Sequence, residues 1–351
     1  MAAGSFASLR ENVKYYQENN YAQLIRTIDL KNNFTNSDFV YVDEVAYDFL
    51  WRVQLKEPNI VLPNIGANIG EKYYVKPQDL PKNKNVLGPN AILLRSKCND
   101  THFVYFRLST SSYDNEMKKL VGASGQPKFN KTDLKKVSLF MPSLIEQKRI
   151  AYFLALLEER IATQNKIIDK LQSLIKGIAQ KIVRSNKPNV RLYECVECSS
   201  STQQESEVCE QGAYPVYGAN GIVGYLDDYN TEGEAVYIIK DGSGVGTVSY
   251  VTGKCSATGT LNTLQAKDGY SLQYLYYLLK VFNFEPYKTG MAIPHIYFKD
   301  YGKAKVFCPS YTEQLQYARL LSAIDSKLSV EKNTLRNLSL QKQYLLRQMF
   351  I

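Results

Sequence analysis

The sequence contains two glycine clusters that could bind the phosphate of a nucleotide. The first runs from Gly66 to Lys72 and the second from Gly242 to Gly246. A phosphate-binding loop has four residues between its glycines and a Ser or Thr after its lysine, and a dinucleotide-binding loop opens a helix. The first cluster does not have this spacing, and the second is followed by a β-rich run. Both clusters are therefore predicted to be hairpin turns.

Metal binding and acid–base catalysis have weak support. Cys195 and Cys198 are closely spaced, with Cys209 and Cys255 further on, but a zinc site of this kind usually has a second close pair. The chain has 2 histidines, and it lacks both a nucleophile–base pattern and the Asn-Pro-Pro-aromatic run of amino-methyltransferases. We expect no metal and no cofactor in this chain. The sequence favours a binding protein over an enzyme.

Charge and composition indicate a negatively charged partner. The 351 residues carry a formal net charge of +9, and 44% hydrophobic with 22% charged residues is ordinary for two or three globular domains. A basic chain favours nucleic acid before an anionic membrane. The sequence has no apolar run of the roughly 18 residues that span a bilayer, and MAAGSFASLR lacks the apolar core of a signal peptide. Because the 6 cysteines have no framework spacing, we expect a cytoplasmic protein without a membrane partner.

The same helix-start motif occurs twice, 167 residues apart, as PSLIEQ at 142–147 and PSYTEQ at 309–314. In each copy the serine can accept a hydrogen bond from the amide of the glutamate, while the glutamate side chain reaches back to the amide of the serine. This capping box marks the start of a helix. Two long helices are therefore predicted to begin at these positions.

The residues after each capping box follow the pattern of a coiled coil. Apolar residues recur at alternating intervals of four and three, which is the a/d seam of a left-handed coiled coil. Polar residues interrupt both seams at one heptad position, Gln164 and Glu331, and Lys342 is a further exception. Two helices of about 40 residues, roughly 60 Å long, are predicted to pair with each other. Packing of each helix on its own globular core is the weaker alternative. The predicted seam consists of Ile150, Leu154, Leu157, Ile161, Gln164, Ile168, Leu171, Ile175, Ile178, Ile182, Leu321, Ile324, Leu328, Glu331, Leu335, Leu338 and Leu345.

The duplication extends to the segments that precede the helices. NIVLPNIGANIGEKYYV from Asn59 resembles VYIIKDGSGVGTVSYV from Val236, and FVYFRL at Phe103 corresponds to YLYYLL at Tyr274. We predict an α+β fold in which two β-rich domains are separated by two long helices, with an internal pseudo-twofold duplication. The predicted segments are a first β-rich domain at 1–141, a first long helix at 142–187, a second β-rich domain at 188–308 and a second long helix at 309–351.

These motifs, in this order, resemble the DNA-specificity subunit of type I restriction–modification enzymes. The resemblance rests on the helix openings PSLIEQKRIAYFL and PSYTEQLQYARLL and on YPVYGANGIVGYLDDY at Tyr214, DGSGVGTVSY at Asp241 and YLYYLL. YAQLIRTIDL at Tyr21 and GANIGEKYYV at Gly66 resemble another version of the same recognition domain. The resemblance covers nearly the whole chain. One departure is a strand-like lead-in to the second domain, VRLYECVE at Val190, which has no counterpart in the first.

The resemblance implies a non-catalytic reader of double-stranded DNA. Two target recognition domains would each read one half of a split, asymmetric site. Opposed half-sites place the two domains in opposite orientations, so the helices should run antiparallel and Gln164 could face Glu331. The resemblance also implies two methyltransferase subunits, which carry S-adenosylmethionine and methylate adenine N6, and the restriction subunits of the full enzyme.

The residues that contact DNA are expected in the glycine turns, in the VYGANG turn and in the segments that lead into the long helices. Lys and Arg bind phosphates, whereas Asn, Gln, Ser, Arg and Tyr read base edges. The alternative for each candidate is a solvated surface residue or a turn former, and His295 could equally be a packed loop residue. The candidates are Asn64, Asn68, Lys72, Gln126, Lys128, Lys131, Tyr217, Asn220, Lys240, Ser243, Thr247, Lys288, His295 and Tyr297.

Two other classes of protein are alternatives to a specificity subunit. A coiled-coil adaptor for other proteins would lack sequence-specific DNA binding and would not co-purify with a methyltransferase. A fused restriction or methyltransferase enzyme would need a cofactor loop and a catalytic motif, neither of which the sequence offers.

Overall fold

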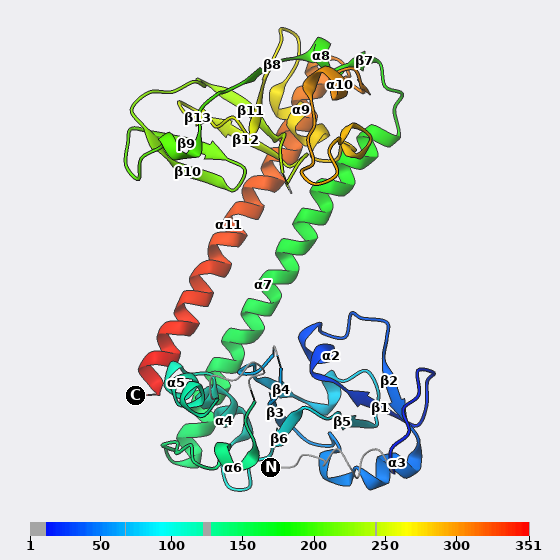
Figure 1. Cartoon of the computed structure of the whole chain (residues 1–351), viewed down its shortest axis with the longest axis vertical. Helices are drawn as coiled ribbons and strands as arrows, with labels where there is room; N and C mark the ends of the chain where they lie inside the picture. Colours follow the sequence, from blue (N-terminus) through cyan, green and yellow to red (C-terminus); the bar gives the residue numbers. More distant parts are fainter. Residues whose placement is uncertain (1–11, 67, 122–127, 243, 351) are drawn as a thin grey trace. The chain divides into compact units, whose positions relative to one another are not determined.

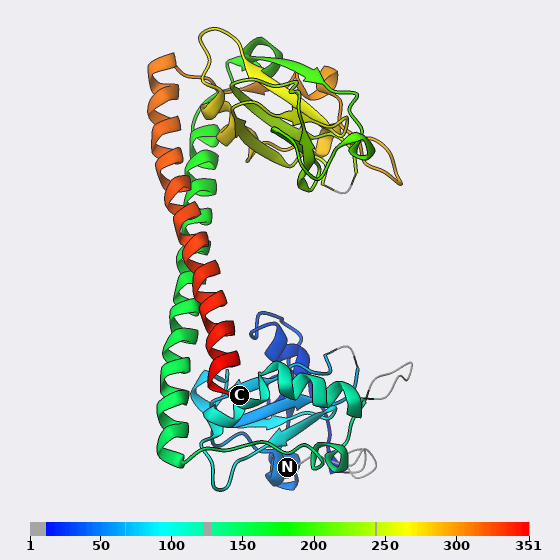
Figure 2. The same cartoon turned by 90° about the vertical axis from the view of Figure 1, so that its left-hand side faces the viewer.

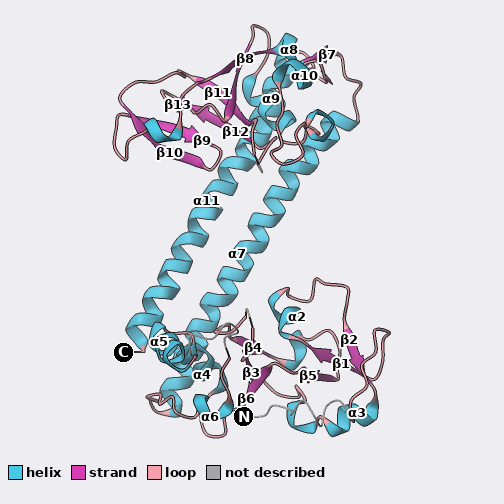
Figure 3. Ribbon diagram, viewed as in Figure 1, coloured by secondary structure: helices cyan, strands magenta, loops and turns pink. Residues whose placement is uncertain are grey.

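The fold combines two long helices with two globules of strands and short helices, as Figure 1 and Figure 3 show. This architecture is the α+β fold predicted from the sequence. The structure is a computed structural model, and it describes residues 12–66, 68–121, 128–242 and 244–350.

The chain divides into two compact units. The first consists of Met1–Thr163 with Leu335–Ile351, and the second of Gln164–Thr334. Each unit therefore holds one globule and one part of each long helix. The predicted division at residues 141, 187 and 308 follows the order of segments along the chain, and it stays a prediction.

The globule of the first unit contains two three-stranded sheets. In one, β1 is antiparallel to β2 and parallel to β5, and in the other β3 lies antiparallel between β4 and β6. Successive side chains of a strand point to opposite faces, so Val61 joins one hydrophobic cluster while Ile60 and Leu62 join the other. The strands are β1 (Ala22–Ile25), β2 (Val40–Val42), β3 (Asn59–Pro63), β4 (Tyr73–Val75), β5 (Asn85–Leu87) and β6 (Ala91–Leu94). The short helices are α2 (Thr27–Lys31), α3 (Glu44–Phe49), η1 (Trp51–Val53), η2 (Pro77–Asp79), α4 (Thr101–Leu108), α5 (Ser111–Leu120) and α6 (Lys131–Leu134).

The globule of the second unit repeats this strand pattern. Strand β9 is antiparallel to β10 and parallel to β13, and β11 lies antiparallel between β12 and β14. The second globule also has β8, which extends the larger sheet, and the pair β7–β15. The strands are β7 (Val190–Arg191), β8 (Val196–Ser200), β9 (Tyr214–Gly218), β10 (Gly221–Leu226), β11 (Glu234–Ile239), β12 (Val248–Thr252), β13 (Ser256–Ala257), β14 (Leu261–Ala266) and β15 (Lys305–Val306). The short helices are α8 (Leu192–Cys195), η3 (Glu205–Glu207), α9 (Leu272–Leu279), η4 (Glu285–Tyr287) and α10 (Phe298–Tyr301).

Two segments that the sequence pattern singled out have a definite fold. The lead-in VRLYECVE forms β7, the helical turn α8 and the start of β8, so its strand-like prediction is right only at its two ends. The corresponding runs FVYFRL and YLYYLL both lie in helices, α4 and α9. Each of these helices begins with a side-chain cap, Asp100 in α4 and Ser271 in α9.

The two long helices begin at the predicted capping boxes. Helix α7 (Leu144–Arg184) and helix α11 (Tyr311–Met349) follow Ser143 and Ser310. The backbone amide of Ser143 donates to the carboxylate of Glu146 at 3.0 Å, and the amide of Glu146 donates to the serine hydroxyl at 3.4 Å. The second copy repeats both contacts, at 3.2 and 3.5 Å. The predicted capping boxes are confirmed.

The helices pair in an antiparallel sense within each unit. In the first unit, Leu154 of α7 packs in one cluster with Phe350, which follows the end of α11. In the second unit, Ile182 near the end of α7 and Leu321 near the start of α11 line one small cavity. Every residue of the predicted seam is buried or half-buried. Figure 2 shows the second globule beside the end of α7 and the start of α11.

Polar side chains of the seam form hydrogen bonds and an ion pair between the two long helices. The side-chain Nε2 of Gln164 donates to the backbone carbonyl of Glu331 at 3.1 Å and also to the carboxylate of that residue. The expectation that these two residues face each other is confirmed. Lys342 pairs with Glu158 at 2.6 Å, and both side chains are about three-quarters buried. A buried polar pair can align only in one register, so these contacts favour a single alignment of the two helices.

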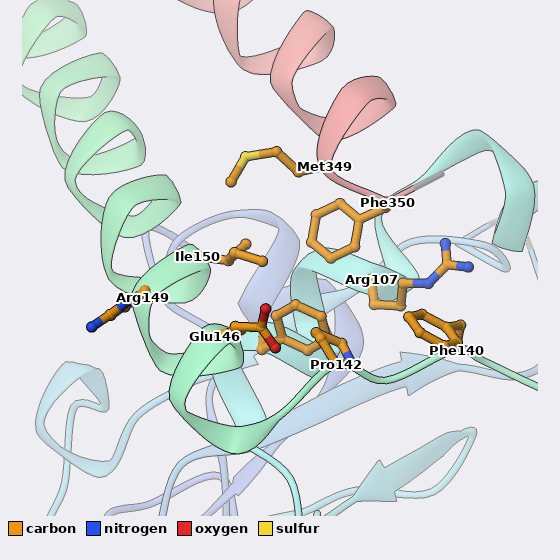
Figure 4. A pocket seen from close by; sticks show the side chains of 9 residues that line it. Arg107, Phe140, Pro142, Glu146, Arg149, Ile150, Met349 and Phe350 are labelled. Atoms are coloured by element: carbon orange, nitrogen blue, oxygen red, sulfur yellow. The ribbon is translucent and has the colours of Figure 1, made fainter.

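The base of the first globule rests on the helix pair. Phe103 and Phe106 of α4 pack against Leu154 and Phe350. A cavity of about 290 Å³ lies beside this cluster, and Figure 4 shows Ile150, Met349 and Phe350 around it. Arg107 also lines the cavity; it is 9% exposed and donates to the hydroxyl of Thr110 at 3.2 Å.

Candidate nucleic-acid interface

A glycine-containing hairpin turn joins two antiparallel strands in each globule, β3 to β4 in the first and β11 to β12 in the second. Each turn has two glycines with positive φ. These are Gly66 and Gly70, at +90° and +91°, and Gly242 and Gly246, at +92° and +89°. Other residues rarely adopt this backbone conformation, so the glycine spacing specifies the turn. The prediction that both clusters are hairpin turns is confirmed.

In the first unit, the segment that precedes α7 pairs with this turn. Ile65 and Lys128 form an antiparallel bridge. The amide of Phe129 donates to the carbonyl of Asn64 at 3.1 Å, and the side-chain Nδ2 of Asn64 donates to the carbonyl of Phe129 at 3.1 Å. Asn64 therefore holds the segment in place, while Lys128 is exposed beside it.

The second unit repeats this contact with different side chains. Asp241 and His295 form the equivalent bridge, and Nδ1 of His295 lies 2.7 Å from Oδ1 of Asp241. The amide of Gly242 donates to the carbonyl of Pro294 at 3.0 Å. The turn and the segment that leads towards α11 are thus joined through both backbone and side chains. The amide of Ile296 donates to the carbonyl of Lys240 at 2.9 Å, so the backbone brings the predicted candidates Lys240 and His295 close together.

Three further candidates of the second unit lie around this turn. Lys288 precedes Thr289, whose amide and carbonyl bond with His295 at 2.9 and 2.8 Å. The ammonium group of Lys288 also pairs with Glu285 at 2.6 Å. Thr247, at the end of the turn, and Tyr297, after the bridge, are both exposed. The second turn therefore presents a mixed set of basic, hydroxyl and aromatic groups.

The corresponding turn of the first unit is already occupied by internal contacts. Lys72 forms an ion pair with Asp114, and its side chain is only 11% exposed. Asn68 accepts a hydrogen bond from Lys31 at 2.8 Å, and Lys31 also pairs with Glu71 at 3.0 Å. Lys72 and Asn68 would have to exchange these partners to contact DNA.

The carboxylate of Glu71 is held in its charged form. Burial works to raise the pKa of Glu71, but hydrogen bonds from the Tyr73 hydroxyl and from Lys31 outweigh it and leave the pKa below its ordinary value. Burial, followed by the same carboxylate, raises the pKa of Tyr73. A negative charge thus remains at the first turn, where it is paired with Lys31 and would otherwise repel a phosphate.

The remaining candidates lie apart from these contacts or cannot be placed. Tyr217 is half-buried against the second globule's hydrophobic cluster, and burial raises its pKa. Asn220 is exposed between β9 and β10, and Lys131 is half-buried at the start of α6. Gln126 and Ser243 lie outside the described residues.

A glutamine fastens each globule to a long helix. In the first unit, the side chain of Gln147 accepts from the amide of Asp100, the cap of α4, at 2.9 Å. The same side chain donates to the carbonyl of Pro142 and to Oδ1 of Asn99, each at 2.8 Å. Gln147 is 2% exposed. We call this arrangement the glutamine clamp.

The second unit has the same glutamine clamp. Gln314 accepts from the amide of Ser271, the cap of α9, at 2.9 Å, and it donates to the carbonyl of Pro309 at 2.9 Å. It is also 2% exposed. Each clamp fixes the start of a long helix to the first turn of a globule helix. One buried amide side chain in each unit therefore links the globule to its long helix, in addition to the apolar packing between them.

Sequence reasoning missed several of these residues. The glutamine clamp had a signal, because the glutamine follows the capping glutamate in both copies of the repeated opening. Asp241 could have been noticed because it lies inside the second glycine turn. Lys31 had no signal, since it reaches the first turn from a distant part of the chain.

The chain belongs to the type I restriction modification DNA specificity domain family. The family model matches residues 9–173 and 189–339, which is most of the chain in two parts. The two matched parts agree with the duplication of turn, clamp and long helix seen in the structure.

Relatives and solved structures of this family are distant in sequence. The Escherichia coli type I restriction enzyme EcoprrI specificity subunit is 27% identical over 117 residues, which cover 33% of this chain and 29% of that protein. A putative type I specificity subunit from Mycoplasma genitalium is 24% identical and covers 72% of this chain and 71% of its own length. The crystal structure of a type I restriction-modification S subunit from M. genitalium has a TM-score of 0.63 at 21% identity, covering 84% of this chain and 83% of that one. The match therefore spans less than a third of the E. coli relative, and the structural likeness concerns the fold alone.

The described part of the chain was also expected to hold no metal and no membrane span. Among the described residues, no group of three or more His, Cys, Asp or Glu side chains is arranged to hold a metal ion. In the same part of the chain, neither the long helices nor the short ones have an apolar stretch that could cross a bilayer.

Proposed function

We propose that this chain is the DNA-reading subunit of a type I restriction–modification enzyme, and that each globule reads one half of a split, asymmetric site. The observation that carries the proposal is the repeated assembly of hairpin turn, pre-helix segment and glutamine clamp. In both units a turn and the segment before a long helix are joined by a β-bridge. A scaffold that is duplicated in this way fits a ligand that presents two half-sites.

Of the two globules, that of the second unit brings more of the candidate DNA-binding residues together. Lys240 and Lys288 would bind phosphates, whereas His295, Thr247 and Tyr297 would contact base edges or sugar. The contact between His295 and Asp241 supports this assignment because it fixes the orientation of the imidazole ring. A ring held in one orientation directs its hydrogen bond to one position, which allows it to distinguish one base edge from another. In the first unit, Lys128 is the exposed basic residue at the corresponding bridge.

The paired helices would set the gap between the two half-sites. A flexible linker would leave the separation and rotation of two reading domains undefined, and ordering it on binding would cost entropy. A buried polar contact such as that between Gln164 and Glu331 instead favours one register. A fixed register would give a fixed number of base pairs between the half-sites.

The same duplication would provide two docking surfaces for methyltransferase subunits. Apolar side chains are exposed at equivalent places on the two long helices, Leu144 and Phe153 on α7 and Tyr311 and Leu320 on α11, each about half exposed. Exposed apolar residues that recur on both copies suit one partner bound twice. The partner would carry S-adenosylmethionine and methylate adenine N6. The specificity subunit itself would be non-catalytic and without a cofactor, and restriction subunits would join the full enzyme.

Exchanging one globule tests this proposal. Residues 190–308 are replaced by the corresponding segment of another specificity subunit, and the chimaera is produced with the methyltransferase that modifies DNA with the parent chain. Methylation sites are then mapped across a genome. The proposal expects one half of the methylated site to change and the other half to stay as in the parent. A change in both halves, or methylation unaffected by the exchange, would contradict the assignment of one half-site to each globule.

A further inference from the structure

Two cysteine thiols face each other at the base of the second globule. The Sγ atoms of Cys195 and Cys308 lie 3.8 Å apart. Cys195 ends helix α8 and is 0% exposed, whereas Cys308 follows β15 and is 7% exposed. A disulfide has an S–S distance of about 2.05 Å, so the two sulfurs are in contact but not bonded.

The backbone around the thiol pair is already held together. Strands β7 and β15 pair through Val190 and Val306. The side chain of Asn189 donates to the carbonyl of Cys308 at 2.7 Å and accepts from its amide at 2.9 Å. The chain therefore enters and leaves the second globule at one fixed point, with both thiols beside it. A cross-link there would not require the two segments to move into place.

We propose that Cys195 and Cys308 form a reversible thiol–disulfide site that small hydroperoxides oxidise. The disulfide would join the two ends of the second globule at its base. A hydroperoxide suits the site because a reagent the size of hydrogen peroxide can reach buried sulfur atoms through brief local openings. Larger disulfide reagents would need a wider opening.

The chemistry is balanced by the two thiols and one peroxide. The thiolate of Cys195 attacks one peroxide oxygen, the O–O bond breaks, and the sulfur becomes a sulfenic acid while hydroxide leaves and takes up a proton. The sulfur of Cys308 then attacks the sulfur of Cys195, the S–S bond forms, and the S–O bond breaks to release water. Two thiols are oxidised and one peroxide is reduced to two water molecules.

The immediate surroundings support Cys195 as the attacking group. The hydrogen bond from Cys308 lowers the pKa of the Cys195 thiol, and the same contact raises the pKa of Cys308. A thiolate is the nucleophile in the first step. Oxidation of Cys195 consumes that thiolate and removes the contact that raises the pKa of Cys308, so Cys308 can then give up its proton and act as the resolving group.

The first globule has no such pair at the equivalent place. The residue 167 positions before Cys308 is Met141, whose thioether cannot form a disulfide. A disulfide in the second globule would close a loop over nearly the whole globule, and such cross-links stabilise mainly by restricting the unfolded chain. Oxidation should therefore raise the thermal stability of the second globule and leave the first unchanged.

The test treats the full chain with hydrogen peroxide and maps its cysteines. Cys98 and Cys209 are exposed, so both are first changed to serine to prevent bonds between molecules. After peroxide treatment and alkylation under denaturing conditions, we expect a cross-linked peptide joining Cys195 to Cys308, a higher midpoint of thermal unfolding, and reversal of both by dithiothreitol.

Matched variants identify the cause of any stabilisation. Cys308→Ser should abolish the cross-link and the rise in midpoint, and Cys308→Met, which copies Met141 of the first globule, covers the case in which serine is not tolerated. Cys255→Ser is the control for another buried thiol, since Cys255 lies 3.2 Å from the hydroxyl of Tyr237. The inference is overturned if Cys195 and Cys308 remain free thiols after peroxide treatment, or if the midpoint rises equally in Cys308→Ser.

Discussion

The two units use the same contact to fasten a globule to a long helix but differ in the charged residues near it. Gln147 and Gln314 make matching hydrogen bonds to the caps of α4 and α9, at 2.9 Å in both cases. Beside α4, Glu158 and Lys342 form an ion pair between the two long helices at 2.6 Å. Beside α9, the residues 167 positions away are Asp325 and Ile175, which cannot form that ion pair.

The groove of the second unit is consequently open and basic. A cavity of about 400 Å³ there is lined by Ile175 and Asp325 and by Lys176, Lys280 and Lys332. The hydroxyl of Tyr277 donates to Asp325 at 3.4 Å. In the first unit, burial and then the Glu158 carboxylate raise the pKa of Tyr105 to about 12. The two units therefore share the buried glutamine, Gln147 or Gln314, and differ in the charged residues near it.

The largest effect is expected from breaking the seam itself. Inserting four residues after Gln164 in α7 alone changes the helical phase of every later residue, so the apolar stripes of the two helices no longer meet. We expect modification by the complex with its methyltransferase to fall to background. Hydrogen exchange of the strands in both globules should stay at wild-type protection, and normal modification by a folded insertion variant would contradict the pairing.

A matched pair of core substitutions tests whether the two units are equally packed on the helices. Leu154 is 0% exposed and Leu321, its counterpart 167 residues later, is 1% exposed. Leu154→Ala and Leu321→Ala should each lower the free energy of unfolding by about 2–5 kcal/mol, because each leaves a cavity. Denaturant titration measures the loss, and hydrogen exchange locates it in one unit. A cost below about 1 kcal/mol for one variant alone would show that only one globule depends on the helix pair.

The glutamine clamps predict a smaller and equal effect in the two units. Gln147→Leu and Gln314→Leu each leave the cap amide of a globule helix and a proline carbonyl without their partner. An unsatisfied buried polar group costs about 1–3 kcal/mol, and the two variants should agree within the error of denaturant titration when Asn99, which Gln147 also binds, is changed to alanine in both proteins. Glutamate at either position is the control, because it keeps the acceptor and loses the donor. Clearly unequal losses would mean that the clamps are not equivalent.

The ion pair between Glu158 and Lys342 should contribute less to the free energy of unfolding than either glutamine clamp. Glu158 and Lys342 are partly exposed, at 29% and 27%, so solvent screens their attraction. A double-mutant cycle with Glu158→Gln and Lys342→Met should give a coupling of about 0.2–1 kcal/mol that weakens at high salt. The second unit offers a reciprocal variant, Ile175→Lys, which should gain a similar coupling with Asp325. Coupling that does not depend on salt would contradict an electrostatic origin.

The smallest expected difference between the units is in how their stability changes at mildly acidic pH. His102 of α4 stacks on Tyr74 with ring centroids 4.0 Å apart, and burial lowers its pKa from 6.5. Glu158 and Asp100 oppose this shift and Lys76 adds to it. The unfolded chain then binds a proton more readily, so stability is lost as pH falls below about 6.5 and through the folded pKa.

The counterpart of His102 in α9 is Gln273. His102→Gln should therefore make the first unit as insensitive to mild acid as the second. Urea midpoints measured from neutral to mildly acidic pH provide the test, with His295→Asn as the control for the other histidine. A decline that persists unchanged in His102→Gln would assign the sensitivity to another group.

The sequence predicted the repeated parts of this molecule well. Capping boxes, heptads and hairpin glycines depend on local spacing, so Ser143, Gln164 and Gly242 could be placed before any coordinates were known. The contact between Gln164 and Glu331 followed from their shared heptad position and from the antiparallel sense that the family resemblance implied.

The candidate DNA-binding residues were harder to predict, because their surroundings come from distant segments. Nothing near Lys72 in the chain indicates that Asp114 pairs with it, and nothing near Asn68 points to Lys31. The lead-in at Val190 also misled, since the amides of Leu192 and Tyr193 in its short helical turn bond to the carbonyls of Ala304 and Gly302, which come from a distant part of the chain. Which turn residues meet DNA stays a prediction.

The most direct test of the account is the map of methylated adenines in a genome modified by this chain with its methyltransferase. The proposal that each globule reads one half-site, with the paired helices setting their separation, predicts a methylated motif in two parts with an unread gap of constant length. A single unbroken motif, or two parts whose spacing varies from site to site, would contradict that account.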